Sequence, residues 1–275
     1  MDAWRAGFFP VRWSGTWPDG HLEVYCPPDR PQAALLAAGA AGSKAPAKVP
    51  SAKSRQDAVL RRHREHPGLV DAPAQPTDHL ATWRALASAP DRVAALTAHL
   101  APLATRPGDA DLLRAIAAQV MAIAIADDRL VITLRTGEGD GLQVIGSAPW
   151  SGAVTRMPAD LLPVLRRHNG LRTGDAAEWL ELYAYDGERF LVDTEDWYQP
   201  EPLPSDDPFS AVPLIAPLSN GSDLFLYHPT DPQPDGSARF LCLNHENGRM
   251  DEVMPSGAGG TFLRMLADRL DVPSG

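Results

Sequence analysis

Apolar residues recur at helical spacing in the middle of the chain. Thr77 or Asp78 can cap a first helix that runs through Trp83, because a side-chain oxygen there accepts the free N–H groups of the first turn. Pro90-Asp91 can start a second helix, DRVAALTAHLAPLA. The third stretch, GDADLLRAIAAQVMAIAIA, is apolar almost all round, which predicts a buried helix starting near Asp109 or Asp111.

Alternation of apolar and polar residues replaces the helical spacing further on. RLVITLRT and GDGLQVIG flank the turn residues GEGDG, which predicts a β-hairpin. More strands are expected towards the C-terminus, bounded by Pro, Gly or Asn: WLELYAYDG, ERFLVDTEDW, VPLIAPLS, DLFLYHP and ARFLCLNHENG. The chain closes with TFLRMLADRL, an amphipathic helix with Phe262, Leu263, Leu266 and Leu270 on one face.

The segment MPADLLPVLRRHNGL carries helix boundary signals. Pro158 suits the start of a helix, where its missing N–H costs nothing, and Pro163 falls within the first turns. Asn169-Gly170 tolerates positive φ and predicts a sharp exit from this helix.

Strands grouped between helices predict an α+β fold with an antiparallel sheet. Ahead of it, Gly7–Cys26 resembles a hairpin, GAAGSKAPAKVPSAKS a flexible linker, and RQDAVLRRHREH a short basic helix. We therefore divide the chain into residues 1–79 (hairpin and linker), 80–150 (helices and a hairpin) and 151–275 (the α+β domain).

Charge is unevenly distributed along this chain of net charge −10. Residues 150–275 contain nine lysines and arginines against twenty acidic residues, a net charge of −11, and the remainder carries +1. The acidic part would repel nucleic acid and attract a basic protein. On charge alone, solubility is the more frequent cause of an acidic domain.

The N-terminus has no basic region followed by an apolar one, and no apolar run is long enough for a membrane span. Cys26 and Cys242, far apart in sequence, are expected to be buried thiols. These features predict a reduced, cytoplasmic protein.

Histidines suggest chemistry at two places. His63 and His66, with His79 nearby, are spaced for a metal on a helix, but flanking arginines and missing partner ligands favour a solvated basic helix. His168 could act as a general base, but the end of a helix suits a partly positive histidine anyway.

Motifs for hydrolases, phosphate loops and zinc peptidases are missing from the sequence. The run Ser256–Gly260 could seat an anion at a helix N-terminus, although a plain loop is the simpler interpretation.

An acidic and aromatic segment is the strongest candidate site. Three interpretations fit it: core aromatics with a solvated acidic face, a protein interface, or a pair of carboxylates for glycoside cleavage. Its residues are Tyr185, Asp186, Glu188, Phe190, Asp193, Glu195, Asp196, Trp197 and Tyr198.

The order of motifs from Met157 to Leu270 resembles the SUKH superfamily. Met157-Pro158 and the HNG at residues 168–170 match its "LP…NG" signature. VPLIAPLSNGSDLFLYH, ARFLCLNHENG and TFLRMLADRL follow in the family's order, with Tyr227-His228 where an acidic residue is usual. The resemblance implies a curved antiparallel sheet flanked by helices. It also implies a bacterial immunity protein that blocks a toxin, or a scaffold or regulatory binding protein.

We therefore expect a non-catalytic binding protein that occludes a protein partner such as a basic toxin, without nucleic acid, membrane, cofactor or metal. The alternatives are a hydrolytic enzyme with a site between the two halves of the chain, and a regulatory scaffold protein. The expected partner-binding residues are Trp179, Asp193, Glu195, Asp196, Trp197, Asp206 and Asp207.

Overall fold

The computed structural model describes residues 51–174, 179–191, 212–213, 215–243 and 252–273. The expected hairpin at Gly7–Cys26 and most of the linker lie outside these residues. The last linker residues begin a helix, which Ser51 caps by accepting a hydrogen bond from the Ser54 N–H at 3.2 Å.

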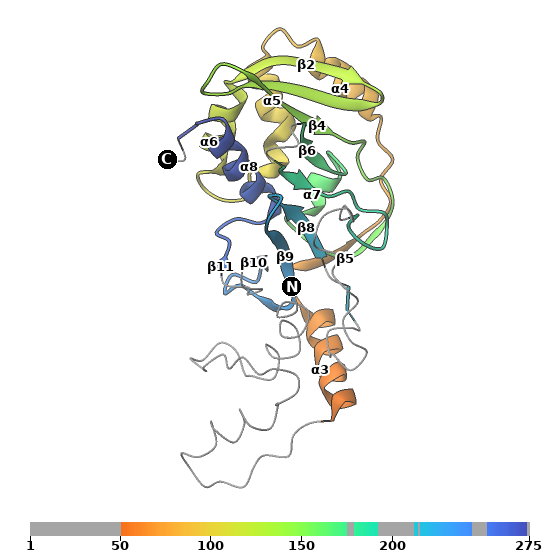
Figure 1. Ribbon diagram of the computed structural model, residues 1–275. Helices are drawn as coiled ribbons and strands as arrows, with labels where there is room; N and C mark the ends of the chain where they lie inside the picture. Colours follow the sequence, from red (N-terminus) through yellow and green to blue (C-terminus); the bar gives the residue numbers. More distant parts are fainter. Residues whose placement is uncertain (1–50, 175–178, 192–211, 214, 244–251, 274–275) are drawn as a thin grey trace.

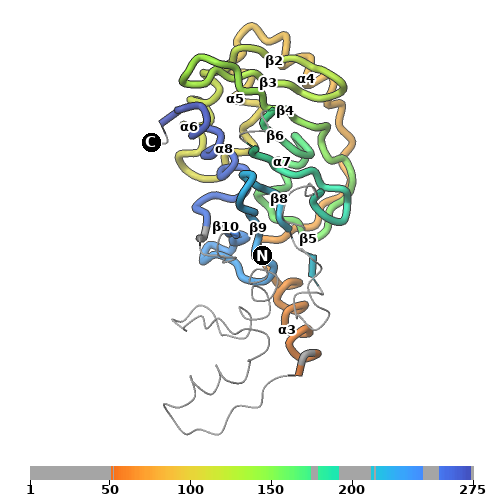
Figure 2. The backbone as a smooth tube through the Cα atoms, viewed as in Figure 1, coloured from red at the N-terminus to blue at the C-terminus, as the bar shows by residue number. Residues whose placement is uncertain are grey.

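Six α-helices and one short 3-10 helix occur in the described residues. They are α3 (Ala52–Glu65), α4 (His79–Ala87), α5 (Arg92–Leu100), η1 (Ala101–Leu103), α6 (Asp109–Ala117), α7 (Leu162–Leu165) and α8 (Ala258–Arg269). Helix α3 contains the predicted basic helix, and in Figures 1 and 2 it extends away from the rest of the described chain.

The strands form one large and one small antiparallel sheet. The small sheet pairs β1 (Leu69–Ala72) with β5 (Val154–Pro158). The large sheet has the order β11-β10-β9-β8-β7-β6-β4-β3-β2, so its strands follow one another along the chain except that β5 is skipped. Its strands are β2 (Val120–Ala126), β3 (Arg129–Arg135), β4 (Gly141–Gly146), β6 (Leu171–Thr173), β7 (Glu181–Leu182), β8 (Ile215–Ser219), β9 (Leu224–Pro232), β10 (Ala238–Leu243) and β11 (Glu252–Val253).

Helix caps and hairpin signals identified several elements correctly. Asp78 and Asp91 cap α4 and α5, each accepting a hydrogen bond from the backbone N–H three residues later. The hairpin across GEGDG is β3–β4, in register from Leu130 opposite Gly146 to Arg135 opposite Gly141. The predicted α+β fold with an antiparallel sheet is confirmed.

The third predicted helix is wrong in its second half. Helix α6 ends at Ala117, and Val120–Ala126 forms β2. There, Ile123 and Ile125 are half-buried while the intervening alanines are exposed, which is the two-residue period of a strand. Asp127 and Asp128, at φ 48° and 57°, form a tight turn that pairs β2 with β3.

The helix expected from Pro158 begins later than predicted. Pro158 is the last residue of β5 and lies opposite Leu69 of β1, whereas α7 starts at Leu162 with Pro163 in its first turn. The pairing partner is about 90 residues away in sequence, so no local signal could identify it. The predicted exit at Asn169-Gly170 is wrong in position, because α7 ends at Leu165, but Gly170 does have the expected positive φ, 106°.

Helix α8 starts earlier than expected, because Ala258–Gly260 is its first turn and not a plain loop. A Cβ on Gly259 would lie 2.8 Å from the carbonyl oxygen of Leu103, so glycine is required where α8 approaches η1. The predicted apolar face is confirmed, since Phe262, Leu263, Leu266 and Leu270 are all buried.

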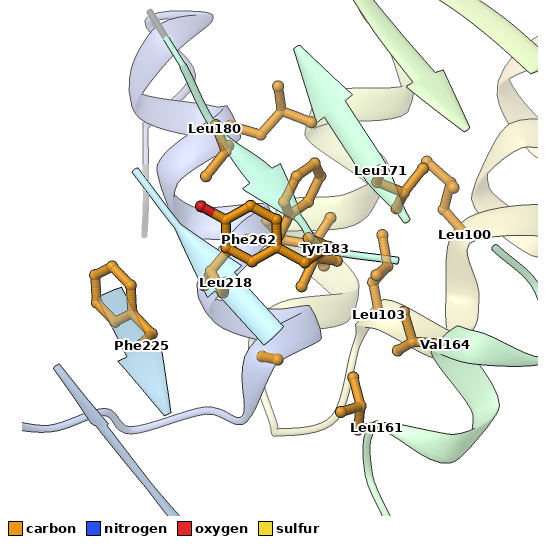
Figure 3. Close-up of a cluster of buried hydrophobic side chains, with 14 of the residues drawn as sticks. Leu100, Leu103, Leu161, Val164, Leu171, Leu180, Tyr183, Leu218, Phe225 and Phe262 are labelled. Carbon is orange, nitrogen blue, oxygen red and sulfur yellow. The ribbon is translucent and has the colours of Figure 1, made fainter. Parts of the chain in front are cut away.

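One hydrophobic cluster extends from Leu69 to Val272 and contains side chains from both sides of residue 150. Figure 3 shows its centre, where Phe262 of α8 lies among side chains of η1, α7 and strands β6 to β8. The large sheet is also continuous across residue 150, through the β4–β6 pairing. The proposed division at residues 150 and 151 therefore falls inside a shared core.

Candidate functional site

Trp179 is the one expected partner-binding residue within the described part of the chain. It is half-buried before β7, where its Nε1 donates to Glu181 Oε2 at 3.0 Å and its carbonyl oxygen accepts from Arg269 Nη2 at 2.8 Å. It therefore connects β7 to the end of α8. Six other expected residues lie outside the described residues: Asp193, Glu195, Asp196, Trp197, Asp206 and Asp207.

The described part of the acidic and aromatic segment separates the two kinds of residue. Tyr185 and Phe190 are buried core residues with ring centroids 5.3 Å apart. Asp186 is exposed and accepts hydrogen bonds from the N–H groups of Arg189 and Glu188, which lower the pKa of its carboxyl group. Leu191 follows with 49% of its surface exposed. In residues 185–191 the carboxylates thus lie outside and the aromatic rings inside.

Arginines of the acidic part are directed towards the main chain. Arg156 donates to the carbonyl oxygens of His63, Leu69 and His66, the last two at 3.0 and 2.9 Å. Arg166 likewise donates to three carbonyl oxygens. Of the eight arginines described in this part, four donate to main-chain oxygens: Arg156, Arg166, Arg239 and Arg269.

The carboxylates of the acidic part are oriented differently. Among the described residues from 150 to 273, the exposed arginines are Arg172 and Arg189. The exposed acidic residues are Asp186, Glu188, Asp235, Asp268 and Asp271. Asp235 is paired with Arg106 at 2.9 Å. The exposed charged groups in this described part therefore comprise two arginines and five carboxylates, so its surface is acidic.

The histidines of α3 are not on a solvated face. His63 and His66 are buried, and the His63 Nδ1 lies 2.9 Å from the Pro229 carbonyl oxygen. The predicted basic helix is therefore present, but the prediction that these two side chains are solvated is wrong. The pKa of His66 is lowered to about 4, mainly by burial and also by the nearby Arg156 guanidinium. Within the described residues, no group of three or more His, Cys, Asp or Glu is arranged to hold a metal ion.

A second pair of buried histidines corrects the expectation for His168. The Nε2 atoms of His99 and His168 are 2.8 Å apart, and Trp83 stacks on His168 with ring centroids 5.9 Å apart. One Nε2–H must donate to the other nitrogen, so the accepting ring is neutral in the folded state. Burial is the main reason that the pKa of His99 is lowered to about 4 and that of His168 to about 3, so His168 is not partly positive.

Three polar groups meet at the N-terminus of α8. Tyr227 Oη donates to Asp160 Oδ2 at 2.8 Å and accepts from the Ala258 N–H at 2.9 Å. Burial raises the pKa of the Asp160 carboxyl group and, more strongly, that of the Tyr227 hydroxyl. Tyr227 is only 1% exposed, so the pair holds the helix in place from inside the core.

A second polar cluster lies beside it. Asp109, fully buried, accepts hydrogen bonds from the N–H groups of Thr105 and Arg106 and from Arg264 Nη2, the last at 2.8 Å. Ser256 Oγ lies 3.2 Å from the same carboxylate. These contacts tie α6 to α8.

The outer edge of β2 is a surface that the sequence analysis missed. Met121 is 42% exposed, and Ala122, Ala124 and Ala126 are also exposed. Figure 1 shows β2 at one end of the sheet. The alternation of alanine with larger apolar residues was the available signal, but the high helix propensity of alanine concealed it.

Comparisons with protein-family models, curated proteins and solved structures found no match for this chain. None of the described helices combines the length and apolar character needed to span a membrane.

Proposed function

We propose that this protein is a non-catalytic, cytoplasmic binding protein of the SUKH type, which neutralises a basic protein partner, such as a toxin, by covering its working surface. The observation that carries the proposal is the distribution of charge in the described residues from 150 to 273, where four of the eight arginines donate to carbonyl oxygens and five carboxylates are exposed against two arginines. A surface of this kind steers a basic partner towards it and speeds association.

The order of elements supports the SUKH-type fold for residues 151–275, with a curved sheet as the finer expectation. Strands β8, β9 and β10 follow in sequence as neighbours, and α8 then packs against β7 and β8. At Tyr227, where the family usually has an acidic residue nearby, the buried hydroxyl is bonded to the carboxylate of Asp160.

Association kinetics test the steering claim. The partner would be sought first in the product of the neighbouring gene, since a toxin and its blocker are normally encoded together. Reversing Glu195 and Asp196 to Lys should slow association several-fold at low salt and change dissociation little, because rim charges act mainly on the rate of encounter. The matched control is reversal of Glu138 and Asp140, an exposed pair in the β3–β4 turn, which should leave the rate unchanged. Equal association rates for both double variants would contradict the proposal.

A hydrolytic enzyme with a site between the two halves is the second candidate, favoured by the Asp160–Tyr227 pair beside the Asp109–Arg264 contact, which joins the halves. The stoichiometry of protection separates the two functions. An occluding protein blocks its partner one to one, whereas an enzyme inactivates it at substoichiometric amounts and Asp160→Asn would abolish this. Substoichiometric protection lost in Asp160→Asn would favour the enzyme.

A further inference from the structure

Strand β2, at the edge of the large sheet, has an unusual composition for an edge strand. Strand β2 carries no charge, proline or glycine over seven residues, and no strand in the described residues pairs with its outer side. Such edges are usually protected by charges, proline or a covering element, because their free N–H and C=O groups pair readily with another strand. One of the three exposed large apolar side chains among the described residues, Met121, lies on this strand.

The turn between β2 and β3 determines which backbone groups are open. In a two-residue hairpin the residues flanking the turn, Ala126 and Arg129, exchange hydrogen bonds, and alternate residues repeat this pattern. Ala126 and Ala124 therefore bond β3, whereas Ile125 and Ile123 direct their N–H and C=O groups away from it. Met121 lies at a register shift in the β2–β3 pairing, and its carbonyl oxygen accepts from Arg92 Nη1 at 3.1 Å.

We infer that the β2 edge binds the β2 edge of a second copy of this chain, antiparallel and centred on Ala124. In this register each Ile123 lies opposite the Ile125 of the other copy, which makes four backbone hydrogen bonds. Ala124 lies opposite itself, and the small exposed alanines create no steric conflict. The half-buried isoleucines become covered on the inner face.

Charge complementarity selects this register. It places Met121 of one copy opposite Asp127 of the other, so that Arg92, which is fixed at the Met121 carbonyl, meets that exposed carboxylate. The two-fold symmetry produces this contact twice. A register centred on Ile123 would instead place Met121 opposite Ile125 of the other copy and would need the Met121 carbonyl oxygen for a backbone hydrogen bond. That oxygen already accepts a hydrogen bond from Arg92. Because two short edges bury less surface than a standard interface of about 1,600 Å², the dimer should be weak and reversible.

Sedimentation velocity over a concentration series tests the inference. The full chain should shift from 29.6 kDa towards twice that mass as its concentration rises to about 200 µM, the range of a weak interface. Ala124→Lys should abolish the shift, because the two added charges would lie directly opposite each other. Gln143→Lys is the matched control, since it adds the same charge at an exposed position two strands from the edge.

Two further measurements identify the register. Arg92→Glu should weaken the dimer several-fold while α5 remains folded, because an acidic residue suits the first turn of a helix. Amide exchange of Ile123 and Ile125 should slow with rising concentration, whereas that of Ala124 should not change. A chain that stays monomeric throughout, or an Ala124→Lys variant that dimerises like the wild type, would overturn the inference. The proposed acidic partner surface is separate from β2, so its own test does not depend on this outcome.

Discussion

At the scale of single residues, the hydroxyl group of Tyr227 both donates and accepts a hydrogen bond within the core. It donates to the carboxylate of Asp160, whose pKa is raised by burial, and it accepts from the first N–H group of α8. The hydroxyl favours the charged form of Asp160 and compensates in part for its burial. Removing the hydroxyl therefore affects both a helix end and a carboxylate.

Tyr227→Phe should lower the free energy of unfolding by about 1–3 kcal/mol, the range for leaving buried polar groups without a partner. The loss should be larger at pH 7 than at pH 4. The pKa of Asp160 is higher in the folded than in the unfolded state, so its contribution to stability falls as the pH rises from the unfolded to the folded pKa. Loss of the tyrosine donor raises the folded pKa further and therefore increases this fall. Urea unfolding at both pH values measures the effect.

Tyr185→Phe provides the control. Its hydroxyl donates to a carbonyl oxygen, that of Gly187 at 2.7 Å, and not to a carboxylate. The same chemical change there should give the same loss at pH 4 and pH 7. A pH-independent loss in Tyr227→Phe would contradict the role assigned to Asp160.

At the scale of secondary-structure elements, the β2–β3 hairpin shows how local signals can conflict. Alanines within Val120–Ala126 favour a helix, whereas the two-residue alternation favours a strand. The turn decides between them, because Asp127 and Asp128 both adopt positive φ and fold β2 back onto β3. The helix termini around Asp78 and Asp91 could be predicted, because capping depends on residues only three positions apart.

The turn gives a prediction of its own. Asp128→Gly should raise the free energy of unfolding by about 0.5–1 kcal/mol, because glycine adopts φ 57° without the steric penalty of a side chain. Asp128→Ala should lower it, because alanine lacks the polar side chain that makes the left-handed region tolerable. Thermal unfolding of dilute protein would give the order Gly, Asp, Ala, and any other order would contradict the turn geometry.

At the scale of the whole molecule, histidines lie buried at two separate junctions. His63 and His66 join α3 to β9 and to Arg156, while His99 and His168 join α5 to the end of α7. Burial lowers the pKa of all four. The folded protein therefore holds them neutral at pH values where the unfolded chain takes up protons.

Stability should consequently fall in mild acid. Each lowered pKa contributes stability that is complete above the unfolded value near 6.5 and is lost as pH falls towards the folded value, at about 1 kcal/mol for each pH unit. The urea concentration at the unfolding midpoint should decrease as the pH is lowered from 7.5 to 5.5. His168→Gln should reduce the slope of this pH dependence by about the contribution of one histidine. A flat profile, or an unchanged slope in His168→Gln, would contradict this interpretation.

The candidate surfaces could be predicted only in part. The acidic surplus after Trp150 is a property of the composition, but the inward orientation of Arg156 and Arg166 depends on carbonyl oxygens of residues 63–73 and 150–152. The exposed edge at β2 likewise depends on strand order, since a strand is an edge only relative to its neighbours.

The sequence by itself determined the elements whose causes are local: the caps of α4 and α5, the β3–β4 hairpin, the positive φ of Gly170 and the buried face of α8. Only the tertiary structure decided that Pro158 ends a strand, that His63, His66 and His168 are buried, and that Tyr227 meets Asp160. The physical reason is the same throughout, because burial and non-local pairing join residues distant along the chain, and a local pattern carries no record of its distant partner.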